Sequence, residues 1–177
     1  MKLLKKNSHT LIELLITISL IMVLAVFTLP KTTFSTRTQV LNEINKLFAI
    51  FSYLQQRALA TNSIQEFSIN QEKNIYFFTI NNKKECVQSL SKQIIFGVKK
   101  GIHGPPTKPI HVITKPITFP SSHNLYKVTF TPKGKITPGT LYLSDKNYQY
   151  QGALTCPISQ VSYVRRYLYE NNQWKCI

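Results

Sequence analysis

Acidic residues are scarce in this chain of 177 residues. Seven Asp and Glu stand against 22 Lys and Arg, which leaves a formal net charge of +15. Catalytic motifs are also missing: there is no Gly-x-Ser-x-Gly elbow, no phosphate-cradling glycine loop and no His-Glu-x-x-His helix. The usual constellations for hydrolysis, phosphoryl transfer and metal chemistry are therefore absent at the level of motifs. We expect a protein that is not an enzyme and holds no cofactor, with a membrane-anchored enzyme of unfamiliar site as the alternative.

The excess of basic residues predicts a surface that attracts polyanions. Nucleic acid, anionic lipid headgroups, cell-wall polymers and acidic proteins all fit the same field. A basic background spread over a solvated surface is the alternative. The net charge alone therefore does not identify a binding partner.

The N-terminus carries a long apolar run. Residues 1–8 contain three lysines and no acid, and the 19 residues 11–29 are nearly all apolar before Pro30. At about 1.5 Å per residue this run reaches about 28 Å, which spans the hydrocarbon core of a bilayer. We predict a transmembrane helix over 9–30 with a cytoplasmic N-terminus, because basic residues precede the run. A secretory signal peptide is the competing interpretation, but no convincing small-x-small cleavage site follows the run near Ala25.

Glu13 is the one charged residue inside this run. A charged side chain costs roughly 3 kcal/mol at the centre of a membrane helix and less near its ends. An intramembrane carboxylate is therefore a functional candidate. The alternative is that Glu13 lies at the headgroup level and only marks the end of the helix.

The segment Ser8-His9-Thr10-Leu11-Ile12-Glu13-Leu14-Leu15 resembles the class III leader junction of type IV pilins and type II secretion pseudopilins. The resemblance implies cleavage by a prepilin peptidase between Ser8 and His9, methylation of the new amine of His9, and pairing of Glu13 with the amine of a neighbouring subunit. Ser8 replaces the usual glycine, and His9 replaces the usual phenylalanine. Charge pairing is physically reasonable, because an ammonium and a carboxylate neutralise each other in a medium of low dielectric constant.

An amphipathic helix is predicted after Pro30. Apolar residues recur at steps of three and four along one face: Leu41, Ile44, Leu47, Phe48, Phe51, Leu54 and Ala58. We expect this stripe to pack on the core of the same domain. Pro30 is expected to kink or loosen its junction with the apolar run.

Strand patterns dominate from Ile64 onward. Alternating or β-branched and aromatic stretches predict antiparallel strands at 65–70, 75–80, 94–98, 126–131, 140–143 and 161–169. The pair Asn81-Asn82 supplies a turn. Five prolines and two glycines in 99–124 predict an extended loop rather than a central strand.

Two segments of this region resemble the GspH/FimT branch of the pilin-like family. Residues 56–62, with Arg57 and Asn62, are similar to its Arg-x-x-Ala-x-x-x-Asn helix end in a shortened form. Residues 128–134 and 139–143 are similar to its Phe-x-x-x-Gly turn and the Gly-Thr-hydrophobic strand behind it. The resemblance then covers nearly the whole chain, with the proline-rich middle excepted.

Some FimT-like pilins bind DNA through a C-terminal Gly-Arg-x-Arg element, and residues 162–165 stand in its place here. Only one of the two arginines of that element, Arg165, is kept by position. Together with Tyr163, Arg166 and Lys175 it forms a candidate DNA site, since basic and aromatic side chains together bind single strands. The alternative is a terminal β-hairpin whose aromatic side chains belong to the core and whose charges are solvated.

Cysteine is limited to Cys86, Cys156 and Cys176, and no Cys-x-x-Cys pair occurs. The histidines at 103, 111 and 123 lack the spacing of a closed zinc site, so we expect no bound metal. Outside the cytoplasm three thiols allow one disulfide. We predict Cys156–Cys176, which would join the C-terminal strands, with Cys86 free or paired with another chain.

These expectations combine into an α+β, pilin-like fold in which a long N-terminal helix, membrane-spanning in its first half, packs on an antiparallel β-sheet head. The predicted parts are a prepilin leader (1–8), a transmembrane helix (9–30), its amphipathic continuation (31–62) and a β-rich head (63–177) with a proline-rich loop (99–124). The head is expected on the periplasmic or extracytoplasmic side of the inner (cytoplasmic) membrane.

The predicted function is that of a minor pseudopilin or pilin-like structural subunit of a type II secretion or type IV pilus machine. Its expected partners are other pilins, which contact the N-terminal helix, and prepilin peptidase. A competence pilin that binds DNA for uptake through its basic C-terminal strand is the alternative.

Overall fold

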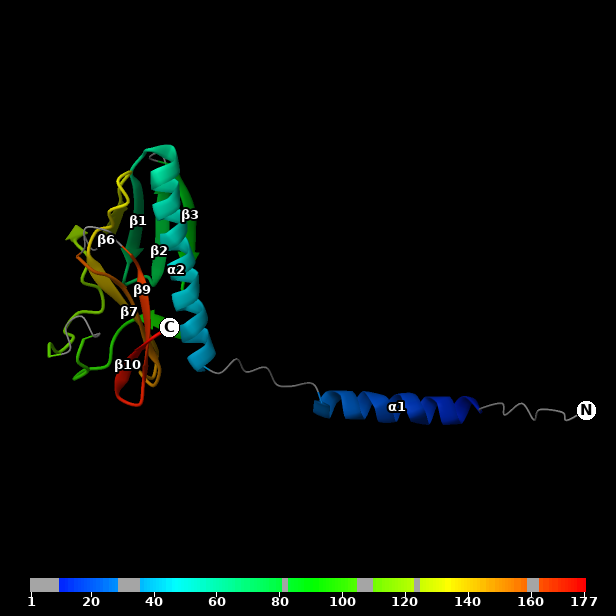
Figure 1. Cartoon of the computed structure of the whole chain (residues 1–177). Helices are drawn as coiled ribbons and strands as arrows, with labels where there is room; N and C mark the ends of the chain where they lie inside the picture. Colours follow the sequence, from blue (N-terminus) through cyan, green and yellow to red (C-terminus); the bar gives the residue numbers. More distant parts are fainter. Residues whose placement is uncertain (1–9, 29–35, 81–82, 105–109, 123–124, 159–162) are drawn as a thin grey trace, which may run out of the picture. The chain divides into compact units, whose positions relative to one another are not determined.

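Figure 1 shows the computed structural model of the chain. The structure describes residues 10–28, 36–80, 83–104, 110–122, 125–158 and 163–177. At 24–28, 80 and 83–86 it describes the backbone alone. The chain divides into two compact units, Met1–Thr33 and Phe34–Ile177. The second unit is called the head below. The predicted leader, the junction at Pro30 and the turn at Asn81-Asn82 lie outside the described residues.

In the first unit, the described residues form helix α1, which spans Leu11–Thr28. All the described side chains of α1, from Leu11 to Val23, are exposed. Among the residues that the structure describes, no helix is both long and apolar enough to cross a membrane. The span predicted over 9–30 therefore stays a prediction.

The head begins with helix α2, Thr36–Thr61, and the predicted amphipathic stripe is confirmed. Its buried side chains are Val40, Glu43, Ile44, Leu47, Phe51, Leu54 and Ala58. Leu41 and Phe48 of the predicted stripe are only half-buried. The helix ends at Asn62, whose φ of 48° lies in the left-handed region that often closes helices.

Glu43 is a buried exception on this face of α2, since the pattern places it among the polar residues. Its Oε1 accepts hydrogen bonds from Ser91 Oγ at 2.5 Å and from Ser91 N at 3.3 Å. The carboxylate therefore holds the segment after strand β3 (Lys83–Ser89) against α2.

In the described part of the head, the strands form two antiparallel sheets of five strands each. The first has the order β3-β2-β1-β6-β5, formed by Lys83–Ser89, Ile75–Ile80, Gln65–Asn70, Leu125–Phe130 and Ser121–Ser122. The second has the order β10-β9-β8-β7-β4, formed by Gln173–Cys176, Arg165–Glu170, Gln151–Cys156, Gly139–Asp145 and Ile94–Phe96. The predicted strands at 65–70 and 75–80 are confirmed to the residue, whereas β8 was not predicted.

The main core lies between α2 and both sheets. The ring of Phe51 on α2 packs edge-to-face against Phe67 on β1, with centroids 4.9 Å apart, and against Phe130 on β6, at 5.3 Å. Such edge-to-face pairs stabilise a core beyond their buried area alone. On the second sheet, Leu141, Leu154 and Leu168 complete the same cluster.

A second, smaller cluster covers the other face of the β7-β8-β9 sheet. It joins Tyr142, Ala153 and Tyr167, the strand neighbours of those core leucines, to Ile102 and Ile113 of the proline-rich segment. Successive residues of a strand point to opposite faces, which separates the two clusters. The segment 99–124 is confirmed as no central strand, since its described residues contain only the two-residue β5 and isolated bridges.

The turn that ends at Gly134, which resembles the Phe-x-x-x-Gly turn of the family, is held by hydrogen bonds. Gly134 has a φ of 75°, its N–H donates to Thr131 O at 2.9 Å, and its carbonyl accepts from Gln55 Nε2 of α2 at 3.0 Å. A left-handed conformation of this kind favours glycine. The turn therefore links the end of β6 to the helix.

Candidate assembly interface

The start of α1 is closed by a reciprocal capping box. The backbone N–H of Thr10 donates to Glu13 Oε2 at 3.1 Å, and the N–H of Glu13 donates to Thr10 Oγ1 at 3.4 Å. Such a pair satisfies backbone donors that have no partner within a helix. Ser/Thr-x-x-Glu before an apolar run is a sequence signal for this cap, so the role of Glu13 at the helix end could have been predicted.

Two other polar side chains of α1, those of Thr17 and Ser19, are satisfied within the helix. Thr17 Oγ1 donates to Leu14 O at 2.9 Å, and Ser19 Oγ donates to Ile16 O at 2.8 Å. In an apolar environment such internal bonds remove the cost of placing a hydroxyl there. Glu13 is then the one ionisable side chain between Leu11 and Thr28, and it lies in the first turn, where the helix dipole favours a negative charge.

The predicted processing residues cannot be compared with the structure, because Ser8 and His9 lie outside the described residues. Glu13 itself is exposed at the start of an exposed apolar helix. This arrangement offers a carboxylate and a wide apolar surface together.

The four residues of the predicted DNA site do not form one cluster. Arg165 is exposed and its guanidinium lies over the ring of Tyr163, 4.6 Å from the centroid. Arg166 instead donates from Nη1 to Asn45 Oδ1 at 2.6 Å and lies over the ring of Phe48, 4.2 Å from its centroid. Arg166 is therefore packed on α2.

Lys175 lies on the strand next to Arg166. It pairs across the β9–β10 ladder with Leu168, and its Nζ lies 3.9 Å from Glu170 Oε2. Glu170 also accepts a hydrogen bond from Arg37 Nε of α2 at 2.7 Å. Sequence reasoning missed Asn45, Phe48 and Glu170 as partners of these cations, since no local pattern shows which strand residues face the helix.

The predicted disulfide between Cys156 and Cys176 is wrong, because both thiols are free. Cys176 pairs with Tyr167 on β9, and Tyr167 pairs with Ala153 on β8, three residues before Cys156. Two strand spacings and three residues separate the two cysteines, far beyond the roughly 7 Å that a disulfide allows between Cα atoms. Cys156 is also buried, which raises the pKa of its thiol to about 12, while Cys176 is exposed.

Within the described part of the chain, no three His, Cys, Asp or Glu side chains come together in a group suited to a metal ion. The backbone of Cys86 lies in β3, and its side chain is outside the described part.

No family model and no curated protein matches the chain. Among solved structures, it is similar to the minor pseudopilin EpsH from the type 2 secretion system of Vibrio cholerae, with a TM-score of 0.50 and 11% sequence identity. The match covers 71% of this chain and 95% of that chain. At this identity the likeness shows the fold alone. The chain has a pseudopilin-like fold, and the α+β arrangement predicted from the sequence is confirmed at that level.

Proposed function

We propose that the protein is a minor pseudopilin-type structural subunit of a type II secretion or type IV pilus machine. The observation that supports this proposal most is the fold likeness to a minor pseudopilin over 95% of that chain's length. The Thr10-x-x-Glu13 motif at the head of an exposed apolar helix agrees with it. The protein would act by assembly and not by catalysis.

The proposed anchor is the apolar run of residues 11–29, inserted in the cytoplasmic membrane with the head on the outer side. The exposed side chains from Leu11 to Val23 need an apolar partner, and the internal bonds of Thr17 and Ser19 make the helix suited to one. In sequence the run continues to Leu29, which gives it the length of a bilayer core.

The proposed mechanism places α1 among the equivalent helices of neighbouring subunits. After removal of the leader, the amine of His9 on one subunit would pair with Glu13 of the next. A carboxylate alone in hydrocarbon is costly, so only the register that brings an amine to it is stable. Glu13 therefore sets the axial position of each subunit, while the apolar side chains supply the contact area.

The N-terminal mass of the mature protein tests this proposal. The full chain is expressed with its native prepilin peptidase and extracted from membranes, and its N-terminal peptide is analysed by mass spectrometry. A start at His9, with or without one added methyl group, is the expected result. A start at Met1, or beyond Ala25, would sink the pilin-pathway assignment.

The DNA-binding alternative retains one specific observation, the exposed stack of Arg165 on Tyr163 beside a net charge of +15. Arg165→Ala tests it better than a double variant, because Arg166 also holds α2. Arg57 over Tyr53, at 5.9 Å, is a matched control pair on the helix. Loss of salt-sensitive binding of single-stranded DNA in Arg165→Ala alone favours a site, whereas equal losses in both variants indicate only a diffuse positive field.

A further inference from the structure

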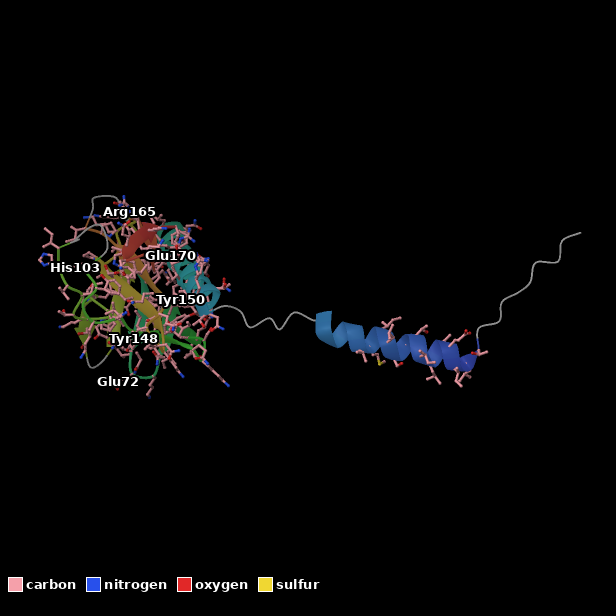
Figure 2. All side chains as sticks on the ribbon, turned by 90° about the horizontal axis from the view of Figure 1, so that it is seen from below. Glu72, His103, Tyr148, Tyr150, Arg165 and Glu170 are labelled. Atoms are coloured by element: carbon pink, nitrogen blue, oxygen red, sulfur yellow. The ribbon has the colours of Figure 1, made fainter. Side chains whose placement is uncertain are left out.

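Two turns meet at one end of the second sheet. Gln151, the first residue of β8, pairs with Tyr169 near the end of β9, so the turns at 146–150 and 171–172 lie side by side. A pocket of about 350 Å³ lies at this place. Figure 2, which views the head from below, labels Tyr148, Tyr150 and Glu170 of its lining.

The composition of the lining is unusual for this basic protein. Its lining residues include three tyrosines, Tyr148, Tyr150 and Tyr169, and four residues with carboxamide side chains, Gln149, Gln151, Asn171 and Asn172. Only one cation, Lys99, and one carboxylate, Glu170, join them. Neutral side chains therefore outnumber charged ones in the lining. Tyr150 packs against the main core and Tyr169 packs on Trp174, so Tyr148, Gln149 and the two asparagines are the most exposed of these side chains. The volume of the pocket falls in the usual range for small ligands.

Hydrogen bonds to Asp145 fix the backbone of the first turn, which carries Tyr148 and Tyr150. The buried carboxylate of Asp145 accepts from Tyr150 N at 2.6 Å and from Asn147 N at 3.1 Å, and Asp145 O accepts from Tyr148 N at 2.9 Å. The ring of Tyr148 also lies against the backbone of Gly97, where an added Cβ would be 3.3 Å from it. Tyr148 is nevertheless 39% exposed, so part of this residue stays available to a ligand.

The second turn is equally defined. Glu170 pairs with Gln173, and the two residues between them, Asn171 and Asn172, have φ values of 52° and 61°. Positive φ at both positions is the type I′ hairpin turn, for which glycine would be the stronger choice at the second position. The sequence has asparagine there, which adds a second carboxamide to the lining. The carboxylate of Glu170 is partly neutralised by Arg37, 2.7 Å from it.

We infer that this pocket binds a short saccharide. A sugar ring has apolar C–H faces that pack on tyrosine rings, and hydroxyl groups at its edge that both donate and accept hydrogen bonds. Carboxamides match such hydroxyls, because each offers two donors and an acceptor. A phosphate-bearing ligand would need more cations than Lys99. An apolar ligand would displace water from the exposed carboxamides of Gln149, Asn171 and Asn172 without replacing its hydrogen bonds. The buried Gln151 already accepts a hydrogen bond from Lys99 N at 3.1 Å. The inference is independent of the proposed role in assembly.

Fluorescence of the single tryptophan provides the measurement. The ring of Trp174 lies 5.0 Å from the ring of Tyr169, so a ligand at Tyr169 changes its surroundings. The full chain, kept in a detergent without a sugar headgroup, is titrated with maltotriose, triacetylchitotriose and trigalacturonate. We expect saturable binding of at least one of them with a millimolar or lower Kd, and no change with glycerol.

Two variants assign the binding to the pocket. Tyr148→Ala should weaken it at least tenfold, while Tyr163→Ala, an equally exposed tyrosine outside the lining, should leave it unchanged. Asn172→Gly removes one carboxamide without opposing the positive φ and should weaken binding severalfold in a fully folded protein. The inference is overturned if none of the three saccharides binds, or if Tyr148→Ala and Asn172→Gly both bind as the original chain does.

Discussion

Arg165 and Arg166 are consecutive residues with opposite environments. Residues next to each other in a strand face opposite sides of the sheet. Arg165 consequently lies in solvent over Tyr163, whereas Arg166 lies against α2 with Asn45 and Phe48 as partners. A pair of basic residues in a sequence is thus not a pair in space when both belong to a strand.

Arg166→Ala is expected to reduce the free energy of unfolding of the head by about 1–2 kcal/mol, through the loss of a charge-assisted hydrogen bond and a cation–π contact. Arg165→Ala is the matched control and should cost clearly less stability, because that side chain is exposed and its contact with Tyr163 lies in solvent. Urea unfolding of the fragment 34–177, which is a compact unit with its own core, measures both. Equal effects of the two substitutions would contradict the assigned contacts.

Two buried side chains make the head sensitive to high pH. Burial raises the pKa of Cys156 from 9.0 to about 12, and burial also raises the pKa of Tyr142 from 10.0 to about 12, partly offset by a hydrogen bond to Thr140. Between pH 9 and 12 the unfolded chain loses these protons before the folded chain does. The unfolded state then binds fewer protons, so the free energy of unfolding falls as pH rises.

Stability of the fragment 34–177 should therefore decline from pH 9 upward and level off above about pH 12. Cys156→Ala removes one titrating group and should reduce this slope by at most about 1.4 kcal/mol per pH unit. Urea titrations between about pH 8 and 11 provide the test. An unchanged slope in Cys156→Ala would show that the pKa of the Cys156 thiol does not differ between the folded and unfolded states. The exposed Cys176→Ala serves as the control.

The contact between α2 and β8 depends on a residue with no side chain. A Cβ built on Gly152 would lie 1.7 Å from Ile44 Cδ1, so the side chain of Ile44 on α2 occupies the space that a larger residue at 152 would need. Gly152 is a poor strand residue by propensity. The packing of α2 on the second sheet outweighs the low strand propensity of Gly152. Gly152 weakens the strand pattern in the sequence, but its lack of a side chain leaves room for the contact between helix and sheet.

Gly152→Ala should destabilise the head by about 1–3 kcal/mol, the usual cost of an overpacked core. Ile44→Val removes the Cδ1 atom that the added methyl group would strike, so the double variant should recover part of the loss. A double-mutant cycle in urea measures the coupling. Strictly additive effects would mean that β8 and α2 adjust independently of each other.

The whole molecule joins a β-rich head to an apolar helix with one carboxylate. In the proposed assembly, Glu13→Gln keeps the size of the side chain and its ability to accept from Thr10 N, but removes the charge. We expect the variant to be inserted and processed normally and to enter filaments at least tenfold less often. Leu14→Gln is the control: it places the same amide on the next residue, keeps the charge of Glu13, and should leave incorporation into filaments unchanged.

Co-purification of the full chain with its partner pilins from membranes measures this incorporation. Normal incorporation of Glu13→Gln would mean that the carboxylate acts only as the helix cap. Loss of the Glu13→Gln protein from the membrane itself would assign Glu13 to insertion instead of pairing.

Local patterns were enough for the elements whose residues carry a strong period. The stripe from Ile44 to Ala58 predicted the buried face of α2, and the apolar, aromatic-rich run at 75–80 predicted β2. The run Thr10-Leu11-Ile12-Glu13 indicated the pilin-like class, and the fold likeness agrees with that class. These signals are local, because each depends on neighbours along the chain.

Only the tertiary structure decided which distant residues meet. It buries Glu43 against Ser91, separates Cys156 from Cys176 across three strands, and assigns Arg166 to α2 rather than to an open basic surface. It also brings two turns of the second sheet together around a pocket of tyrosines and carboxamides. The physical reason is that strand order and register join residues far apart in the chain, and no local pattern of polarity contains that pairing.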